Sequence, residues 1–325
     1  MQQLPPVDWT TAARTGRSLV HPGPELSRDE IAQVVAELRD AAERATPEVE
    51  RVTGMTRPAS GRVLVVDRPG WIAAVSGSAQ ALLSGAGMVT EPADRSPVDV
   101  VRAKALGVQA GAVFAVIANR ILGQFDPFVA PARLLLVAPN VVSVERHLGV
   151  DPADFRLWVC LHEETHRFQF AQAPWLREHL LGLFGELLDA EELTFGLPPG
   201  KTGDIRDLFS TPEQKRAFDE VTAAMSLMEG HADVMMDRVG TDVVHTYPAI
   251  RAAFETRRDQ RGWGAWIRRL LGFDLKREQY RDGAEFCRQV IASGGIETLN
   301  RAFEAPGLLP TVAEIHDPQQ WLHRI

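Results

Sequence analysis

The stretch from His162 to His166 reads His-Glu-Glu-Thr-His, which is the HExxH pattern. Two histidines four residues apart project from the same face of an α-helix, so both imidazoles can bind one metal ion. Glu163 points off that axis, toward the place where a metal-bound water would lie. The arrangement is typical of zinc hydrolases and predicts Glu163 as a general base. The alternative is a solvated helix face that carries two histidines and two glutamates.

A zinc ion needs a third protein ligand, and the segment from Glu229 to Asp233 offers one. Glu229 and Asp233 are four residues apart and share a helix face, a spacing in which the glutamate binds the metal and the aspartate orients a ligand imidazole. His231 is about 200° round the helix from Glu229, so the two are not expected to bind the same ion. Glu229 is the first candidate for the third ligand. His231 is the alternative, and a site without either residue stays open.

Capping residues in the sequence mark the ends of the two helices that must carry these residues. Asp151 and Pro152 predict the start of the first helix, and Pro174 predicts its end. Thr211, Pro212 and Gln214 form a capping box at the start of the second, and Gly240 predicts its end. The first helix has a broad apolar face, which predicts that it packs against a core: Phe155, Trp158, Val159, Phe168 and Phe170.

The remaining chain reads as mostly helical with a small β element. Ser27 caps a predicted helix that reaches about Ala45, and residues 105–118 predict a core helix. Residues 62–67 and 71–75 are strand-like or short buried runs. Residues 134–137 predict a buried strand shortly before the metal helix. It is either the edge strand that pairs with an extended peptide or an interior element. The fold class is therefore mainly α (α+β).

Several segments, in this order along the chain, resemble a known family. They are residues 7–9, 67–71, 122–126, 162–170, 174–177, 229–233, 276–286, 309–311 and Trp321. On these residues the chain resembles the zincin-like metalloprotease family of high-GC bacteria, a domain family of unknown function with some members labelled as associated with deazaflavin-coenzyme biosynthesis. The resemblance implies a gluzincin-like fold, with His162, His166 and Glu229 as zinc ligands and Glu163 as base. It implies no substrate.

Composition agrees with a bacterial enzyme that has a sizeable core. The chain has 325 residues, of which 45% are hydrophobic. This predicts a single domain over residues 1–325, possibly as two intimate lobes of about 1–150 and 151–325. The formal charge of −8 argues against general affinity for nucleic acid or an anionic membrane. Two cysteines give no disulfide framework, and the first residues lack the pattern of a secretory signal, so the cytoplasm is expected.

Amide hydrolysis passes through an oxyanion that a zinc ion and one or two further donors stabilise. His231 and Tyr280 are the candidates for such donors, and a structural role in the core is the alternative for each. Residues 196–203 predict a loop that could border the site. The arginine-rich segment 251–281 favours a solvated face over an acidic partner surface.

The expected function is that of a zinc-dependent metallohydrolase, first of all a peptidase that acts on a peptide or small amide. Two alternatives from other classes remain. One is a catalytically silent zincin-like binding protein. The other is a non-haem iron enzyme, because two histidines and one carboxylate also form the facial triad of iron oxygenases. The presence of Glu163 favours hydrolysis, since an oxygenase has no need of a base there.

Overall fold

The computed structural model describes residues 7–59, 61–86, 96–188, 211–253 and 278–325 of the chain. Its helices and strands are α1 (Trp9–Leu19), α2 (Arg28–Thr53), β1 (Arg62–Val66), α3 (Arg68–Gly85), α4 (Pro97–Ala118), β2 (Gly123–Asp126), β3 (Arg133–Val137), α5 (Ala138–Leu148), α6 (Pro152–Gln172), α7 (Leu176–Leu188), α8 (Pro212–Val239), α11 (Glu278–Asn300), α12 (Val312–His316) and α13 (Pro318–Arg324), with short 3-10 turns at Arg301–Phe303 and Pro306–Leu308. The predicted mainly α fold with a small β element is confirmed.

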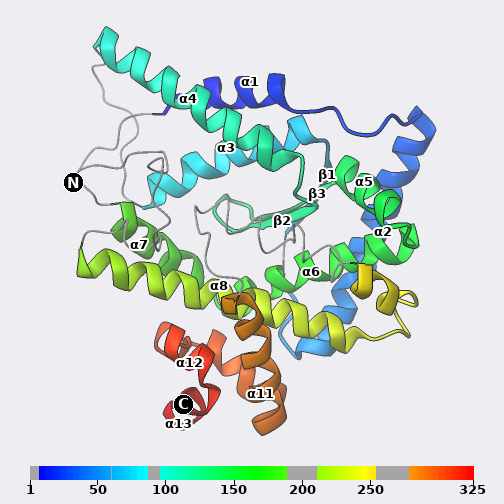
Figure 1. Cartoon of the computed structure of the whole chain (residues 1–325), viewed down its shortest axis with the longest axis vertical. Coiled ribbons are helices and arrows are strands. Elements are labelled where there is room, and N and C mark those ends of the chain that lie inside the picture. The colour runs from blue at the N-terminus through cyan, green and yellow to red at the C-terminus, as the bar shows by residue number, and fades with distance from the viewer. Residues whose placement is uncertain (1–6, 60, 87–95, 189–210, 254–277) are drawn as a thin grey trace.

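The described strands form one three-stranded sheet in the order β1-β3-β2. β1 runs parallel to β3, with Leu64 opposite Leu135, and β2 runs antiparallel to β3, with Gly123 opposite Leu136. Figure 1 shows α1, α3 and α4 as a layer on one side of the sheet, with α6 and α8 on the other side and α11 to α13 beyond α8. The sheet therefore lies between the α4 layer and the two helices that carry the predicted metal ligands.

β3 is the central strand, so of the two alternatives for residues 134–137 the interior strand is confirmed and the edge strand is wrong. Its side chains, including Leu134 and Leu135, are buried on both faces of the sheet. The edge position next to α6 belongs to β2, whose sequence is only Gly-Gln-Phe-Asp. A four-residue strand with a glycine and two polar residues carries little strand signal, which is why the pattern pointed to its neighbour.

Two other helical segments differ from expectation. The strand-like run at residues 71–75 lies inside α3, because Asp67 caps that helix by accepting a hydrogen bond from the N–H of Gly70 at 2.7 Å. Helix α2 continues past Ala45 and through Pro47 to Thr53, where Gly54 in the left-handed conformation ends it. Its buried face packs against α6, and this packing favours the longer helix over the break that a proline ordinarily causes.

Helix α4 is longer than the predicted core helix and packs on only one side. Gly107 and Gly111 let it approach α1 closely, since a Cβ at either position would collide with the α1 backbone. The opposite face exposes several valines, with Val98 at 74% and Val101 at 68% of their full exposure. By length and composition α4 is the one helix in the described ranges that could cross a membrane, although core helices of other proteins pass the same test.

The largest apolar core surrounds α6. It combines residues from α2, β3, α5, α6, α8 and α11, among them Leu38, Leu134, Phe155, Leu227 and Phe286. A second core on the other face of the sheet joins α1, α3 and α4 around Trp71 and Ile72. The first core fixes the positions of α6 and α8, the two helices on which the candidate site depends.

Candidate metal centre

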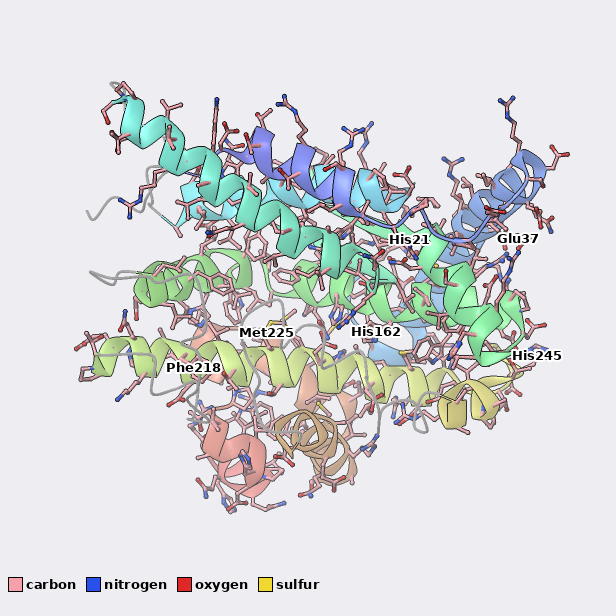
Figure 2. The ribbon with its side chains drawn as sticks, turned by 45° about the horizontal axis from the view of Figure 1, so that its top comes forward. His21, Glu37, His162, Phe218, Met225 and His245 are labelled. Atoms are coloured by element: carbon pink, nitrogen blue, oxygen red, sulfur yellow. The ribbon has the colours of Figure 1, made fainter. Side chains whose placement is uncertain are left out.

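Helix α6 begins and ends where its capping residues predict. The carboxylate of Asp151 accepts a hydrogen bond from the N–H of Asp154 at 2.9 Å, and Pro152 occupies the first helical position. The helix ends at Gln172, two residues before Pro174. Its apolar side chains, including Phe155 and Phe168, are fully buried in the main core. This packing leaves the His162 and His166 face directed toward α8, and Figure 2 shows His162 between the two helices.

Helix α8 also has the predicted limits, with a capping box between Thr211 and Gln214 and an end at Gly240. The segment after α8 returns to the start of α6, where the Asp154 carboxylate accepts hydrogen bonds from the N–H (2.6 Å) and hydroxyl (2.7 Å) of Thr246. On its other side α8 meets α11 at Gly230, where a Cβ would collide with the backbone of Gly283. The position of Glu229 is therefore fixed by α6 on one side and by α11 on the other.

The side chains of His162, His166 and Glu229 converge on one point. Nε2 of His162 and Nε2 of His166 are 3.2 Å apart, and the Glu229 carboxylate oxygens lie 3.6 Å and 3.5 Å from them. Ligand atoms bound to a tetrahedral zinc ion at about 2.0–2.1 Å are about 3.3 Å from one another. The two imidazole nitrogens have this spacing, and one ligand atom from each of the three side chains lies within 4.8 Å of the others, so the three residues suit a zinc ion in their chemistry and are close enough to share it. Within the described ranges, they are the one group of at least three metal-binding side chains that converge in this way.

The electrostatics of the cluster also suit a cation. Burial by itself would raise the pKa of Glu229, but the neighbouring His166 and His162 outweigh burial and lower this pKa. Burial lowers the pKa of His166, with the charge of His162 acting in the same direction, so this ring favours its neutral form. A carboxylate and a neutral imidazole are the states in which these side chains bind a metal. The three side chains are 11–12% exposed, so the cluster is not sealed from solvent.

Glu163 lies under the edge strand and not in the cluster itself. Its side chain is 2% exposed, and burial raises its pKa to about 7, with the charge of His162 opposing the rise and that of Glu229 adding to it. The backbone of Phe125 in β2 also donates a hydrogen bond to Glu163, which lowers the pKa. Gly123 makes room for the carboxylate, because a Cβ there would stand 2.6 Å from Cγ of Glu163. The predicted base is thus held between the ligand helix and β2.

Gln169 is a site residue that the sequence pattern did not single out. Its Oε1 lies 2.9 Å from Nδ1 of His166, the nitrogen that faces away from the other two ligands. Its Nε2 lies 2.9 Å from the carbonyl oxygen of Met228 and 3.0 Å from Nδ1 of His231. The signal available in the sequence was its spacing, since residues 166 and 169 share a helix face. Its partners on α8 could not be read from that spacing.

His231 and Asp233, the other two predicted site residues on α8, have different surroundings from those of the three ligands. His231 is fully buried behind Gln169, packs edge-on against Phe303, and has its pKa lowered to about 3 by burial, so it is neutral. It lies outside the three-ligand group, and this position gives no support to an oxyanion role. Asp233 forms ion pairs with Arg251 at 2.6 Å and with Arg288 at 3.4 Å. Burial by itself would lower the pKa of His162, but the hydrogen bond and charge of Glu229 outweigh burial and raise this pKa, and Asp233 adds only a small part.

Three predictions, for Tyr280, the loop at 196–203 and the arginine-rich segment, concern residues that the structure describes only in part or not at all. Tyr280 lies in the first turn of α11, but its side chain is not among the described ones, so its proposed oxyanion role stays a prediction. The loop at 196–203 and most of the arginine-rich segment also lie outside the described residues.

Cys160 and Cys287 are both buried and unlinked, in agreement with a chain that has no disulfide framework.

The chain resembles a known protein family and a solved structure over nearly its whole length. The family described as zincin-like metallopeptidase matches residues 7–322. A crystal structure described as "a putative hydrolase with a novel fold from Chloroflexus aurantiacus" superposes with a TM-score of 0.75, at 29% sequence identity and over 98% of each chain. No curated protein matches the chain. Both matches span α6 and α8, the two helices that bring His162, His166 and Glu229 together.

Proposed function

Since this chain belongs to the zincin-like metallopeptidase family, we propose that it is a zinc-dependent hydrolase that cleaves amide bonds, in the first place those of peptides. One observation carries the proposal. One ligand atom each from His162, His166 and Glu229 lies within 4.8 Å of the other two. The two Nε2 atoms are 3.2 Å apart, and each lies within 3.6 Å of one of the Glu229 oxygens, so three donors from two helices can share one zinc ion. Three protein ligands leave a fourth position for water, as in catalytic zinc sites.

A zinc ion held by these residues would lower the pKa of a bound water to near 7 and would polarise a substrate carbonyl. The chain supplies the proton transfer. Glu163, which follows His162 on the ligand helix α6, accepts the proton of the attacking water and delivers it to the nitrogen of the departing amine. Its burial raises its pKa toward 7, and a carboxylate with such a pKa can both take up and release a proton near neutral pH.

The edge strand β2 is the proposed support for an extended substrate. β2 pairs with β3 along one side, and the backbone N–H of Phe125 already donates a hydrogen bond to Glu163. A peptide added along this edge would place its carbonyl groups near the base and the metal ligands. The backbone groups of β2 that Glu163 does not use would supply main-chain hydrogen bonds to the peptide. A small amide would lack most of these contacts. The arrangement therefore favours a peptide over a small amide as substrate.

The first test is the metal content of the purified chain by elemental analysis. We expect about one zinc per chain in the wild type and a sharp loss in Glu229→Ala. Glu220→Ala is the matched control, because Glu220 lies on the same helix but is partly exposed and paired with Arg216. Bound iron in place of zinc would favour the oxygenase alternative. A zinc-supplemented protein that binds no metal would overturn the proposal.

The second test is cleavage of a quenched-peptide library by the zinc-loaded protein. Zinc-dependent cleavage that a chelator abolishes and zinc restores is the expected result. If the chain binds zinc stoichiometrically but cleaves no member of a broad library and no small amide, the catalytically silent binding protein becomes the better description.

A further inference from the structure

Gln169 contacts both a metal-ligand imidazole and the backbone of α8. It is fully buried, and its amide group makes contacts at 2.9, 2.9 and 3.0 Å with His166, Met228 and His231. We propose that Gln169 and His231 form a positioning pair that fixes the metal-binding tautomer of His166 and ties α6 to α8 beside Glu229. This inference rests on the proposed zinc site and adds two residues to it.

The backbone of Met228 determines how the amide must be oriented. A carbonyl oxygen can only accept a hydrogen bond, so the Gln169 atom 2.9 Å from it must be the NH₂ group. The amide oxygen then faces Nδ1 of His166, and it too can only accept, so Nδ1 must carry the proton. In a neutral ring the other nitrogen, Nε2, then has a free lone pair, and Nε2 is the atom that faces His162 and Glu229.

The same reasoning assigns the role of His231. The second N–H of the Gln169 amide points to Nδ1 of His231, which must therefore accept. The proton of His231 then resides on Nε2, which is buried and has no hydrogen-bond partner among the described residues. A buried donor without a hydrogen-bond partner lowers the stability of the fold. A histidine at this position is therefore unfavourable unless its Nδ1 is needed as the acceptor for Gln169. The structure thus gives His231 a function as acceptor for Gln169 and not as a metal ligand.

The position of the pair explains why it would matter to both halves of the site. Met228 directly precedes Glu229, so the hydrogen bond from Gln169 to the Met228 carbonyl fixes the backbone that carries the third ligand. His166 and Gln169 are three residues apart on α6. One amide group therefore sets the orientation of an imidazole on α6 and the distance to a carboxylate on α8. Residues that orient metal ligands in this way typically contribute about 10- to 100-fold to metal affinity.

The test compares zinc affinity in Gln169→Leu and Gln214→Leu by competition with a chromophoric chelator. Gln214 is the matched control, because it is also a buried glutamine with hydrogen bonds to a helix cap (Thr211) and to a carbonyl (Leu187), but it lies at the far end of α8. Both variants are expected to lose stability. Only Gln169→Leu is expected to bind zinc about 10- to 100-fold more weakly. Equal zinc affinity in wild type and Gln169→Leu would overturn the proposal.

A second comparison separates the acceptor at His231 from simple filling of space. The side-chain oxygen of an asparagine can occupy the place of the histidine Nδ1, whereas leucine has no acceptor. We expect His231→Leu to weaken zinc binding about 10-fold or more and His231→Asn to restore most of it, despite its smaller volume. An asparagine variant that binds no better than the leucine variant would exclude the acceptor role.

A third measurement needs no metal, so it distinguishes failure of the pair from failure of the proposed function. Nitrogen-15 NMR of the metal-free protein reports which ring nitrogen of His166 carries the proton. The Nδ1–H form is expected in the wild type and a mixture of tautomers in Gln169→Leu. A wild-type protein with the proton on Nε2 would refute the pair whether or not zinc binds. A wild-type protein that has the expected tautomer but does not bind zinc would contradict the proposed zinc hydrolase and leave the positioning pair intact.

Discussion

Gly123 and Glu163 are in backbone-to-side-chain contact, with so little space between them that any side chain at position 123 would displace the carboxylate. A Cβ on Gly123 would lie 2.6 Å from Cγ of Glu163 and 2.9 Å from its Oε1. The edge strand and the predicted base therefore depend on one another: β2 can run over α6 here because residue 123 has no side chain. The contact suggests that the placement of the base can be altered without touching a metal ligand.

Gly123→Ala should reduce turnover while leaving zinc in place. The added methyl group moves Glu163 by a fraction of an ångström or more, and a misplacement of about 1 Å can lower a rate about 100-fold. The check is kcat together with zinc content, on the peptide that the library identifies. Gly77→Ala serves as control, because nothing lies within 4 Å of its added Cβ in α3 and a helical alanine is favoured there. Undiminished kcat in Gly123→Ala would show that the base tolerates the shift or lies elsewhere.

Glu163→Gln should keep zinc and lose turnover. Glutamine has the shape of glutamate but cannot take a proton from water at neutral pH, and positioned general bases typically contribute about 10²- to 10⁴-fold. Steady-state kinetics and elemental analysis on the same preparation measure both quantities. Glu178→Gln, at an exposed carboxylate on α7, is the control. Full activity in Glu163→Gln would remove the general-base assignment.

Gly230→Ala should destabilise the protein and weaken zinc binding together. A Cβ at residue 230 collides with the backbone of Gly283, so α8 and α11 must move apart next to Glu229. Overpacking of this kind costs about 1–3 kcal/mol, which urea unfolding of the metal-free protein measures. Gly182→Ala, with open space around its Cβ, is the control. If Gly230→Ala lowered stability but bound zinc as tightly as wild type, the close contact between α8 and α11 would stabilise the fold without determining the geometry of the metal ligands.

Glu314→Gln should lower stability at pH 7 but not in acid. Burial would raise the pKa of Glu314, but hydrogen bonds from Arg324 (2.6 Å) and from the N–H of Thr311 (2.8 Å) outweigh burial and lower this pKa from its ordinary value of 4.5. A lowered carboxyl pKa contributes stability that is present above pH 4.5 and lost as the pH falls through the folded-state pKa. The expected difference is about 1 kcal/mol at pH 7.

Thermal unfolding from pH 7 down to about pH 3 follows this difference. The gap between Glu314→Gln and wild type should shrink steadily as the pH falls. Glu304→Gln, at an exposed glutamate in the same C-terminal segment, should differ from wild type at neither end of the range. A gap for Glu314→Gln that stays constant with pH would show that its charge contributes nothing.

The sequence predicted the parts of the site that depend on local rules. Capping residues such as Asp151 and Thr211 located both helices, because a cap acts on the backbone within three residues. The HExxH spacing placed His162 and His166 on one face for the same reason. Glu229 was the first candidate for the third ligand, and the structure places its carboxylate beside the two imidazoles.

What the sequence did not predict depends on how elements pack. Gln169 became visible as a site residue only when α8 brought Met228 and His231 next to it. The edge position of β2 depends on the order of strands in the sheet, and a four-residue strand has too short a pattern to reveal that order. The open face of α4 was hidden for a related reason: apolar composition does not say which side finds a partner.

The close contact between α8 and α11 restricts which residues can replace those at the contact during evolution. Gly283 lies against the backbone of Ser226, and Gly230 lies against Gly283, so the two helices touch main chain to main chain over one turn. A larger residue at Gly230 or Gly283 cannot be accommodated by a smaller neighbouring side chain, because the added atoms would meet backbone. Relatives that keep the metal cluster should therefore retain glycine or another small residue at both positions, even where the surrounding core has been exchanged.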